Sequence, residues 1–110
     1  MNADLAKARE AREARRKLVN SCAALVADLE ERVRVFQSDR DVAEAKRTMG
    51  RDRSSFQKRA RQLMERGTLV LLKVDLIQAE AADERDVART ERKALVARVE
   101  ACSAPCAAFL

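Results

Sequence analysis

The chain has 110 residues, of which 47% are hydrophobic and 37% are charged, and its formal net charge is +5. Two glycines and one proline are too few for the turns of an all-β fold, so the composition predicts one small all-α domain. The chain contains no His, Trp or Tyr, which removes the side chain best suited to proton transfer near neutral pH, and we therefore expect a protein that is not an enzyme.

The first predicted helix covers residues 18–37 and follows a charged helical extension over residues 1–17. The extension consists of good helix formers, but alanines are its only apolar face, so we expect it to project into solvent. A break at residues 37–41, where Ser38 or Asp39 could cap a following helix, predicts a turn. From residue 18 onward the apolar residues recur at helical spacing: Leu18, Val19, Cys22, Leu25, Val26, Leu29, Val33 and Phe36.

The second predicted helix covers residues 41–79 and has a weak point near Gly50. A later start, after Gly50, stays open because Ser54 and Gln57 have the spacing of a capping box. Gly67 lies in the middle of the apolar face and costs roughly 1 kcal/mol relative to Ala, so we expect it to permit a close approach between helices. The predicted core face consists of Phe56, Ala60, Leu63, Gly67, Val70, Leu71, Val74 and Ile77.

The third predicted helix covers residues 83–104, with Asp83 as its cap. Pro105 should end or kink it, because proline lacks the amide hydrogen that a helix uses. Its inward residues should be Ala88, Leu95, Val96, Val99 and Cys102. Three helices with short connections predict an antiparallel three-helix bundle, to which the N-terminal extension adds a long charged helix.

The sequence offers no pattern of residues for catalysis, cofactor binding or metal binding. Cys102 and Cys106 have the spacing of one helical face, but zinc would need more ligands and no His is present. Three cysteines without a signal peptide fit free thiols in a reducing compartment, and we expect a cytoplasmic or nuclear protein. No apolar run approaches the ~20 residues that cross a bilayer, so we expect no membrane segment. Acids mixed among the bases in every segment argue against nucleic-acid binding.

A candidate binding surface combines one face of the second helix with one face of the third. Leu69, Leu72 and Leu76 lie opposite the core face of the second helix, and Glu65 and Asp75 border them. On the third helix a neighbouring ribbon follows steps of three and four: Arg89, Arg92, Lys93, Val96 and Glu100. Charged groups around an apolar patch select the identity and orientation of a protein partner.

The stretch from residue 63 to residue 102 resembles the BAG domain, a helical module that binds the ATPase domain of the 70-kDa heat-shock chaperones. LLKVDLI, residues 71–77, is similar to the end of the second helix of that family, and ERKALVARVEA, residues 91–101, is similar to its third helix. Glu65 also stands where the family has an acid ten residues before the Asp. Three features depart from the family pattern: Glu100 replaces the usual Gln, Gly67 is present, and the second loop is somewhat longer.

The resemblance implies that Glu65, Asp75, Arg92 and Lys93 contact the chaperone, and that the chain is a monomeric nucleotide-exchange factor. In the family, the domain binds both lobes of the ATPase domain and favours the open cleft, so that ADP leaves sooner. The alternative is a structural helical-bundle or coiled-coil protein that self-associates through Leu69, Leu72 and Leu76. The mass in solution distinguishes the two hypotheses, since the exchange factor should be monomeric.

Overall fold

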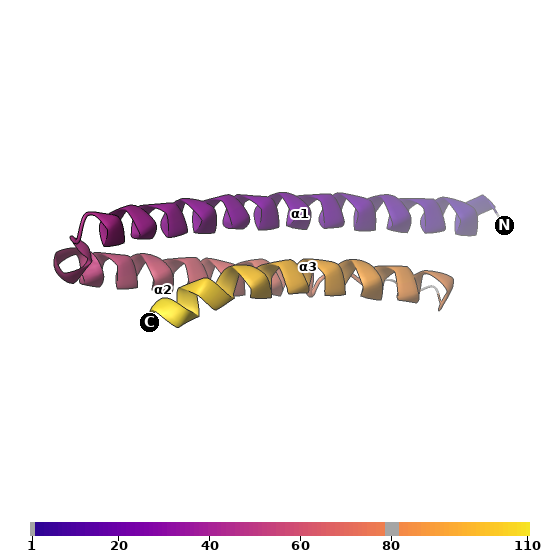
Figure 1. The fold of residues 1–110 in the computed structure, drawn as a ribbon. Coiled ribbons are helices and arrows are strands. Elements are labelled where there is room, and N and C mark those ends of the chain that lie inside the picture. Colours follow the sequence, from indigo (N-terminus) through magenta and orange to yellow (C-terminus); the bar gives the residue numbers. More distant parts are fainter. Residues whose placement is uncertain (1, 79–81) are drawn as a thin grey trace.

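The computed structural model describes residues 2–78 and 82–110, and in these residues it contains three helices. They are α1 (Asn2–Ala45), α2 (Met49–Val74) and α3 (Ala82–Phe109). The helices lie side by side and alternate in direction (Figure 1). Every pair of helices is in contact, and the bundle measures 68 × 17 × 16 Å. The predicted all-α three-helix bundle is confirmed.

One continuous hydrophobic core runs between the three helices. Cys22, Phe36 and Val26 of α1 are fully buried, as are Val74 of α2 and Val99 of α3. The predicted apolar stripes therefore face the core, with the exception of Leu25, which is 38% exposed. Other predicted core residues are only partly buried and pack against its edge: Leu18, Val19, Leu63, Leu71 and Val96.

The predicted turn at residues 37–41 is wrong, because α1 continues to Ala45. It ends in a Schellman motif, in which the Thr48 amide donates to the Ala43 carbonyl and the Arg47 amide donates to the Glu44 carbonyl. Arg47 takes the left-handed conformation that this motif requires, with φ of 59°. The extra turns bury Ala43. The sequence did not predict this helix end, because the left-handed position of a Schellman motif is usually occupied by glycine.

Helix α2 begins at Met49, so the predicted start at residue 41 is wrong and Gly50 lies in its first turn. It ends at Val74, short of the predicted end at residue 79, which lies outside the described residues. The amides of Leu76 and Ile77 donate to the carbonyls of Lys73 and Val74, which continues the chain as a tight turn. This turn places the side chain of Ile77 in the core, where it is fully buried.

Helix α3 begins at Ala82, so Asp83 lies in its first turn and not at the cap position; the side chain of Asp83 is outside the description. The predicted end at residue 104 is also wrong, because the helix continues through Pro105 to Phe109. The last turns of α3 bend away from the line of its earlier part (Figure 1), as a proline inside a helix causes. These turns add two side chains that the sequence analysis missed: Cys106 is buried, and Phe109 packs edge-on against Phe36 with ring centroids 5.7 Å apart.

The charged extension contacts α3 through two of its arginines. Its first turns project beyond the start of α3 (Figure 1), but Arg12 and Arg15 of α1 form ion pairs with Glu84 of α3, and Arg15 also approaches Glu91. The side chain of Arg15 is only 16% exposed. Arg12 and Arg15 therefore connect this part of α1 to α3, while residues 12–14, 16 and 17 are exposed as predicted.

Gly67 faces both other helices, but, contrary to the expectation from the sequence, the helices do not approach so closely there that a glycine is required. A Cβ atom at this position would lie 3.4 Å from Ser103 Oγ, 3.5 Å from Val99 Cγ1 and 3.7 Å from Leu29 Cδ2. These are ordinary van der Waals distances. The glycine thus marks the place where α2 packs against α1 and α3, although the space there would accept one methyl group.

Candidate partner-binding surface

The α2 side of the candidate surface is a row of exposed residues along the flank that faces α3. Gly67 and the half-buried Leu71 contact the core, and Asp75 follows them in steps of four, so it lies on the flank nearest α3. Leu72 and Glu65 lie farther toward solvent, three and ten residues before Asp75. All three of these outer residues are exposed. The structure therefore brings the two acids and Leu72 to one flank.

Asp75 occupies a position where a carboxylate does not stabilise the helix. It is the C-cap residue of α2, and its amide donates to the carbonyls of Leu71 and Lys73. A negative charge at a helix C-terminus opposes the helix dipole and costs roughly 0.3 to 1 kcal/mol. No ion pair offsets this cost among the residues that the structure describes. Folding stability thus gives no reason for an acid at this position.

Ser103 shows which side of α3 faces α2, because its Oγ is the α3 atom nearest to a Cβ atom placed at Gly67. Val96 and Arg89 precede Ser103 by seven and fourteen residues, so the three lie in one row facing α2. Glu100 and Lys93 form the next row outward. Val96 is half-buried, whereas Arg89, Lys93 and Glu100 are exposed. The predicted α3 residues therefore lie together along the flank that faces α2.

Arg92 connects the two helices. Its guanidinium Nη1 donates a hydrogen bond of 3.3 Å to the carbonyl of Ile77, in the turn that follows α2. This carbonyl belongs to a buried residue and would otherwise lack a helical partner. Among the described residues Arg92 forms no ion pair with Glu65 or another acid, and its partner is this backbone carbonyl. A guanidinium has five N–H donors, so the remaining ones are available to a second molecule.

Leu69 lies apart from Asp75 and from α3. Leu69 is separated from Asp75 by six residues, or about 120° around the helix axis, which turns it away from α3. The predicted apolar face opposite the core is nevertheless present, since Leu69, Leu72 and Leu76 are 66%, 60% and 64% exposed. Leu72 lies between Asp75 and Glu65 around the helix axis, whereas Leu69 lies beside Glu65 only. The apolar face and the acids of α2 therefore overlap at Leu72 and Glu65.

A small basic pocket lies at the end of this surface, beside the α2–α3 connection. It has a volume of about 250 Å³ and is lined by Arg92, Arg89, Arg85, Ala88 and Gln78. Arg85 was missed in the sequence, although its spacing of four from Arg89 and seven from Arg92 extends the same ribbon. The basic side of the surface is thus one helical turn longer than predicted.

The thiols of the described residues are buried, and these thiols and the carboxylates form no metal-binding cluster. Burial raises the pKa of Cys22, Cys102 and Cys106, which keeps these thiols protonated and weakly nucleophilic near neutral pH. Within residues 2–78 and 82–110, no group of three or more His, Cys, Asp or Glu side chains could hold a metal ion. No helix in this part of the chain is long and apolar enough to span a membrane.

Comparisons with known proteins give no match: no family model, no curated protein and no solved structure matches this chain. Functional inference therefore depends on the residues of the chain and on their arrangement.

Proposed function

We propose that the α2–α3 surface binds the ATPase domain of a 70-kDa heat-shock chaperone and promotes the release of ADP. The observation that supports this proposal most directly is the separation of charge on neighbouring helices. Asp75 and Glu65 on α2 and Lys93 and Arg89 on α3 are exposed on the flanks of two neighbouring helices, and among the described residues none of them pairs with another. The resemblance to the BAG domain supplies the identity of the partner.

The mechanism would be a shift in a conformational equilibrium of the partner. A rigid surface that binds the open form of the ATPase domain more tightly than the closed form raises the open population by the difference in affinity. Acids on one helix and bases on the next suit a partner that presents complementary charges on two lobes. The chain contributes binding and orientation, and it forms or breaks no covalent bond.

Binding of the isolated ATPase domain, measured by titration calorimetry, tests the proposal. Asp75→Ala and Lys93→Ala should each weaken binding about tenfold or more, because each removes a charge that forms no ion pair with the residues the structure describes. Asp41→Ala is a matched control, since Asp41 is an exposed acid on α1. Arg92→Ala is less decisive, because it also leaves the Ile77 carbonyl without its hydrogen bond. Equal affinity of the wild type, Asp75→Ala and Lys93→Ala proteins would reject the surface.

A second candidate function is self-association through Leu69, Leu72 and Leu76. The observation that favours it is their exposure, between 60% and 66% for large apolar side chains along one face of α2. Light scattering distinguishes this function from the first. A monomer that stays monomeric at high concentration rejects self-association, whereas a dimer that Leu69→Glu dissociates would support it.

A further inference from the structure

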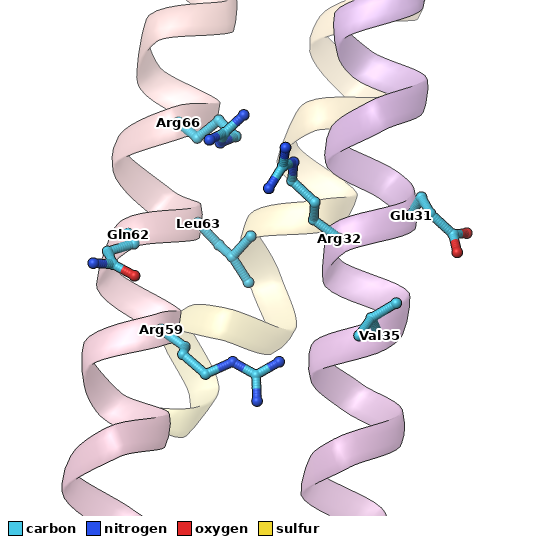
Figure 2. A pocket seen from close by; sticks show the side chains of 7 residues that line it. All are labelled: Glu31, Arg32, Val35, Arg59, Gln62, Leu63 and Arg66. Atoms are coloured by element: carbon cyan, nitrogen blue, oxygen red, sulfur yellow. The ribbon is translucent and has the colours of Figure 1, made fainter.

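A second groove lies between α1 and α2, and arginines from both helices point into it. Its volume is about 610 Å³. Figure 2 shows Arg32 of α1 and Arg59 and Arg66 of α2 reaching into the space between the two helices, with Leu63 between them. Glu31 also lines the groove, but it points away from α2 (Figure 2) and bonds to Arg34.

The three guanidinium groups have more donors than the surrounding acids can use. Arg32 Nε donates to Asp28 Oδ2 over 2.8 Å, and Arg66 Nη1 lies 3.6 Å from the same oxygen, so two guanidinium groups share one carboxylate and one positive charge remains. Arg59 Nη2 donates to Asp39 over 2.9 Å. Each guanidinium carries five N–H donors, and most of these make no bond with the described residues. The groove can therefore accept further carboxylates.

Arg59 is held in place by aromatic rings. Its guanidinium carbon lies 5.5 Å from the ring centroid of Phe36 and 5.3 Å from that of Phe56. Such cation–π contacts fix the position of the charge while they leave part of the guanidinium open. A charge held in this way loses less side-chain entropy when it binds a carboxylate.

Elsewhere in the chain, an arginine of one helix already pairs with two acids of another. Glu84 and Glu91 lie seven residues apart on α3, and Arg15 of α1 contacts both. Val87 stands between them and is 49% exposed. In the α1–α2 groove, Arg59 and Arg66 also lie seven residues apart, which corresponds to about 10.5 Å along the helix. A helix with two acids at the same spacing would place one carboxylate near each arginine.

We propose that the α1–α2 groove binds a helix of a partner protein that carries two acidic residues seven positions apart with an apolar residue between them. The acids would bond to Arg66 and Arg59, and the apolar residue would contact Leu63. Such a helix would lie on the bundle as a fourth helix, in the helix-in-groove mode. A nucleic acid fits less well, because Asp28 and Asp39 border the groove and repel a continuous row of phosphates. The groove is separate from the α2–α3 surface, so the proposal is independent of chaperone binding.

Fluorescence anisotropy with a labelled helical peptide tests the proposal on the full chain. The probe carries two glutamates seven residues apart with a leucine between them, and a matched probe carries glutamines instead. The glutamate probe should bind and the glutamine probe should not. Arg66→Gln and Arg59→Gln should each weaken binding about tenfold, because each removes one of the two guanidinium groups that bond to the acids.

Arg61→Gln is the matched control, because Arg61 is exposed on α2 about 140° around the axis from Arg66. It should leave the affinity unchanged. Absence of binding by the glutamate probe, equal binding of both probes, or an equal loss in Arg61→Gln would overturn the proposal. Displacement of the probe by a short single-stranded oligonucleotide at lower concentration than by unlabelled peptide would assign the groove to nucleic acid and also overturn it.

Discussion

Replacement of Gly67 by alanine should stabilise the protein, although Gly67 is buried where three helices meet. Gly67 lies in the interior of α2, where Gly is about 1 kcal/mol less favourable than Ala. The new methyl group would meet Ser103 Oγ, Val99 Cγ1 and Leu29 Cδ2 at 3.4 to 3.7 Å, which is contact without overlap. The Ser103 hydroxyl is held by its own bond to the Val99 carbonyl, so it need not move. We expect the free energy of unfolding to rise by about 1 to 2 kcal/mol.

Urea unfolding followed by far-UV circular dichroism measures this change in the free energy of unfolding. In thermal unfolding, the same change should raise the melting temperature by roughly 4 °C or more. Gly50→Ala is the control, since Gly50 lies in the first turn of α2 and has no atom near the added methyl group. It should stabilise by about 0.5 kcal/mol or less, from helix propensity alone. A Gly67→Ala protein less stable than the wild type would show that the helices pack more closely than described. Gly67→Leu should destabilise by about 1 to 3 kcal/mol through overpacking.

Four further predictions concern the ends of two helices, the ion-paired Glu84 and the buried thiols. Arg47→Gly should stabilise by about 1 kcal/mol in urea unfolding, because Arg47 has a positive φ in the Schellman motif; no gain would argue against this turn. Phe109→Ala should destabilise by about 2 kcal/mol, since its ring packs against two other phenylalanines; no loss would show that α3 ends before it. Hydrogen bonds from Arg15 and Arg12 lower the pKa of Glu84. The ion pair of Glu84 therefore contributes stability above the ordinary Glu pKa of about 4.3, and this contribution is lost as pH falls through the lower pKa of the folded state. Glu84→Gln should cost stability at pH 7 and little at very low pH. The three buried thiols should react with Ellman's reagent only in denaturant, and rapid labelling of the native protein would contradict their burial. Because burial raises the pKa of these thiols, the stability of the folded protein should fall as pH rises above about 8.5.

The core could be predicted from the sequence because helical periodicity reports directly on burial. Most residues of the predicted stripes are buried or half-buried, including Gly67. The predicted apolar face on α2 is also present, because three leucines at steps of three and four opposite a core stripe have no position inside a three-helix bundle. Periodicity along one helix was sufficient evidence for both features.

The helix ends could not be predicted, because local signals competed with tertiary contacts. Ser38 and Asp39 look like caps, but Asp39 instead pairs with Arg59 of α2, and α1 continues to bury Ala43. Pro105 removes one helical hydrogen bond, but α3 continues past it, and Phe109 packs against Phe36 of α1. In each case the helix extends to a residue that contacts another helix.

The arrangement of the candidate site could be predicted only in part. The positions of Asp75, Lys93 and Glu100 follow from counting residues along each helix. The bond from Arg92 to the Ile77 carbonyl does not, because it depends on where α2 ends and how the chain turns after it. That Leu69 points away from α3 does not follow from counting either, because it depends on which flank of α2 faces α3, as the contacts of Gly67 show.

Release of labelled ADP from the ATPase domain of a 70-kDa heat-shock chaperone, with and without this chain, is the decisive measurement for the proposed function. The wild-type protein should accelerate release, Asp41→Ala should do so equally, and Asp75→Ala should not, while urea unfolding shows that Asp75→Ala is at least as stable as the wild type. An unchanged rate of ADP release in the presence of excess wild-type protein would contradict the proposal.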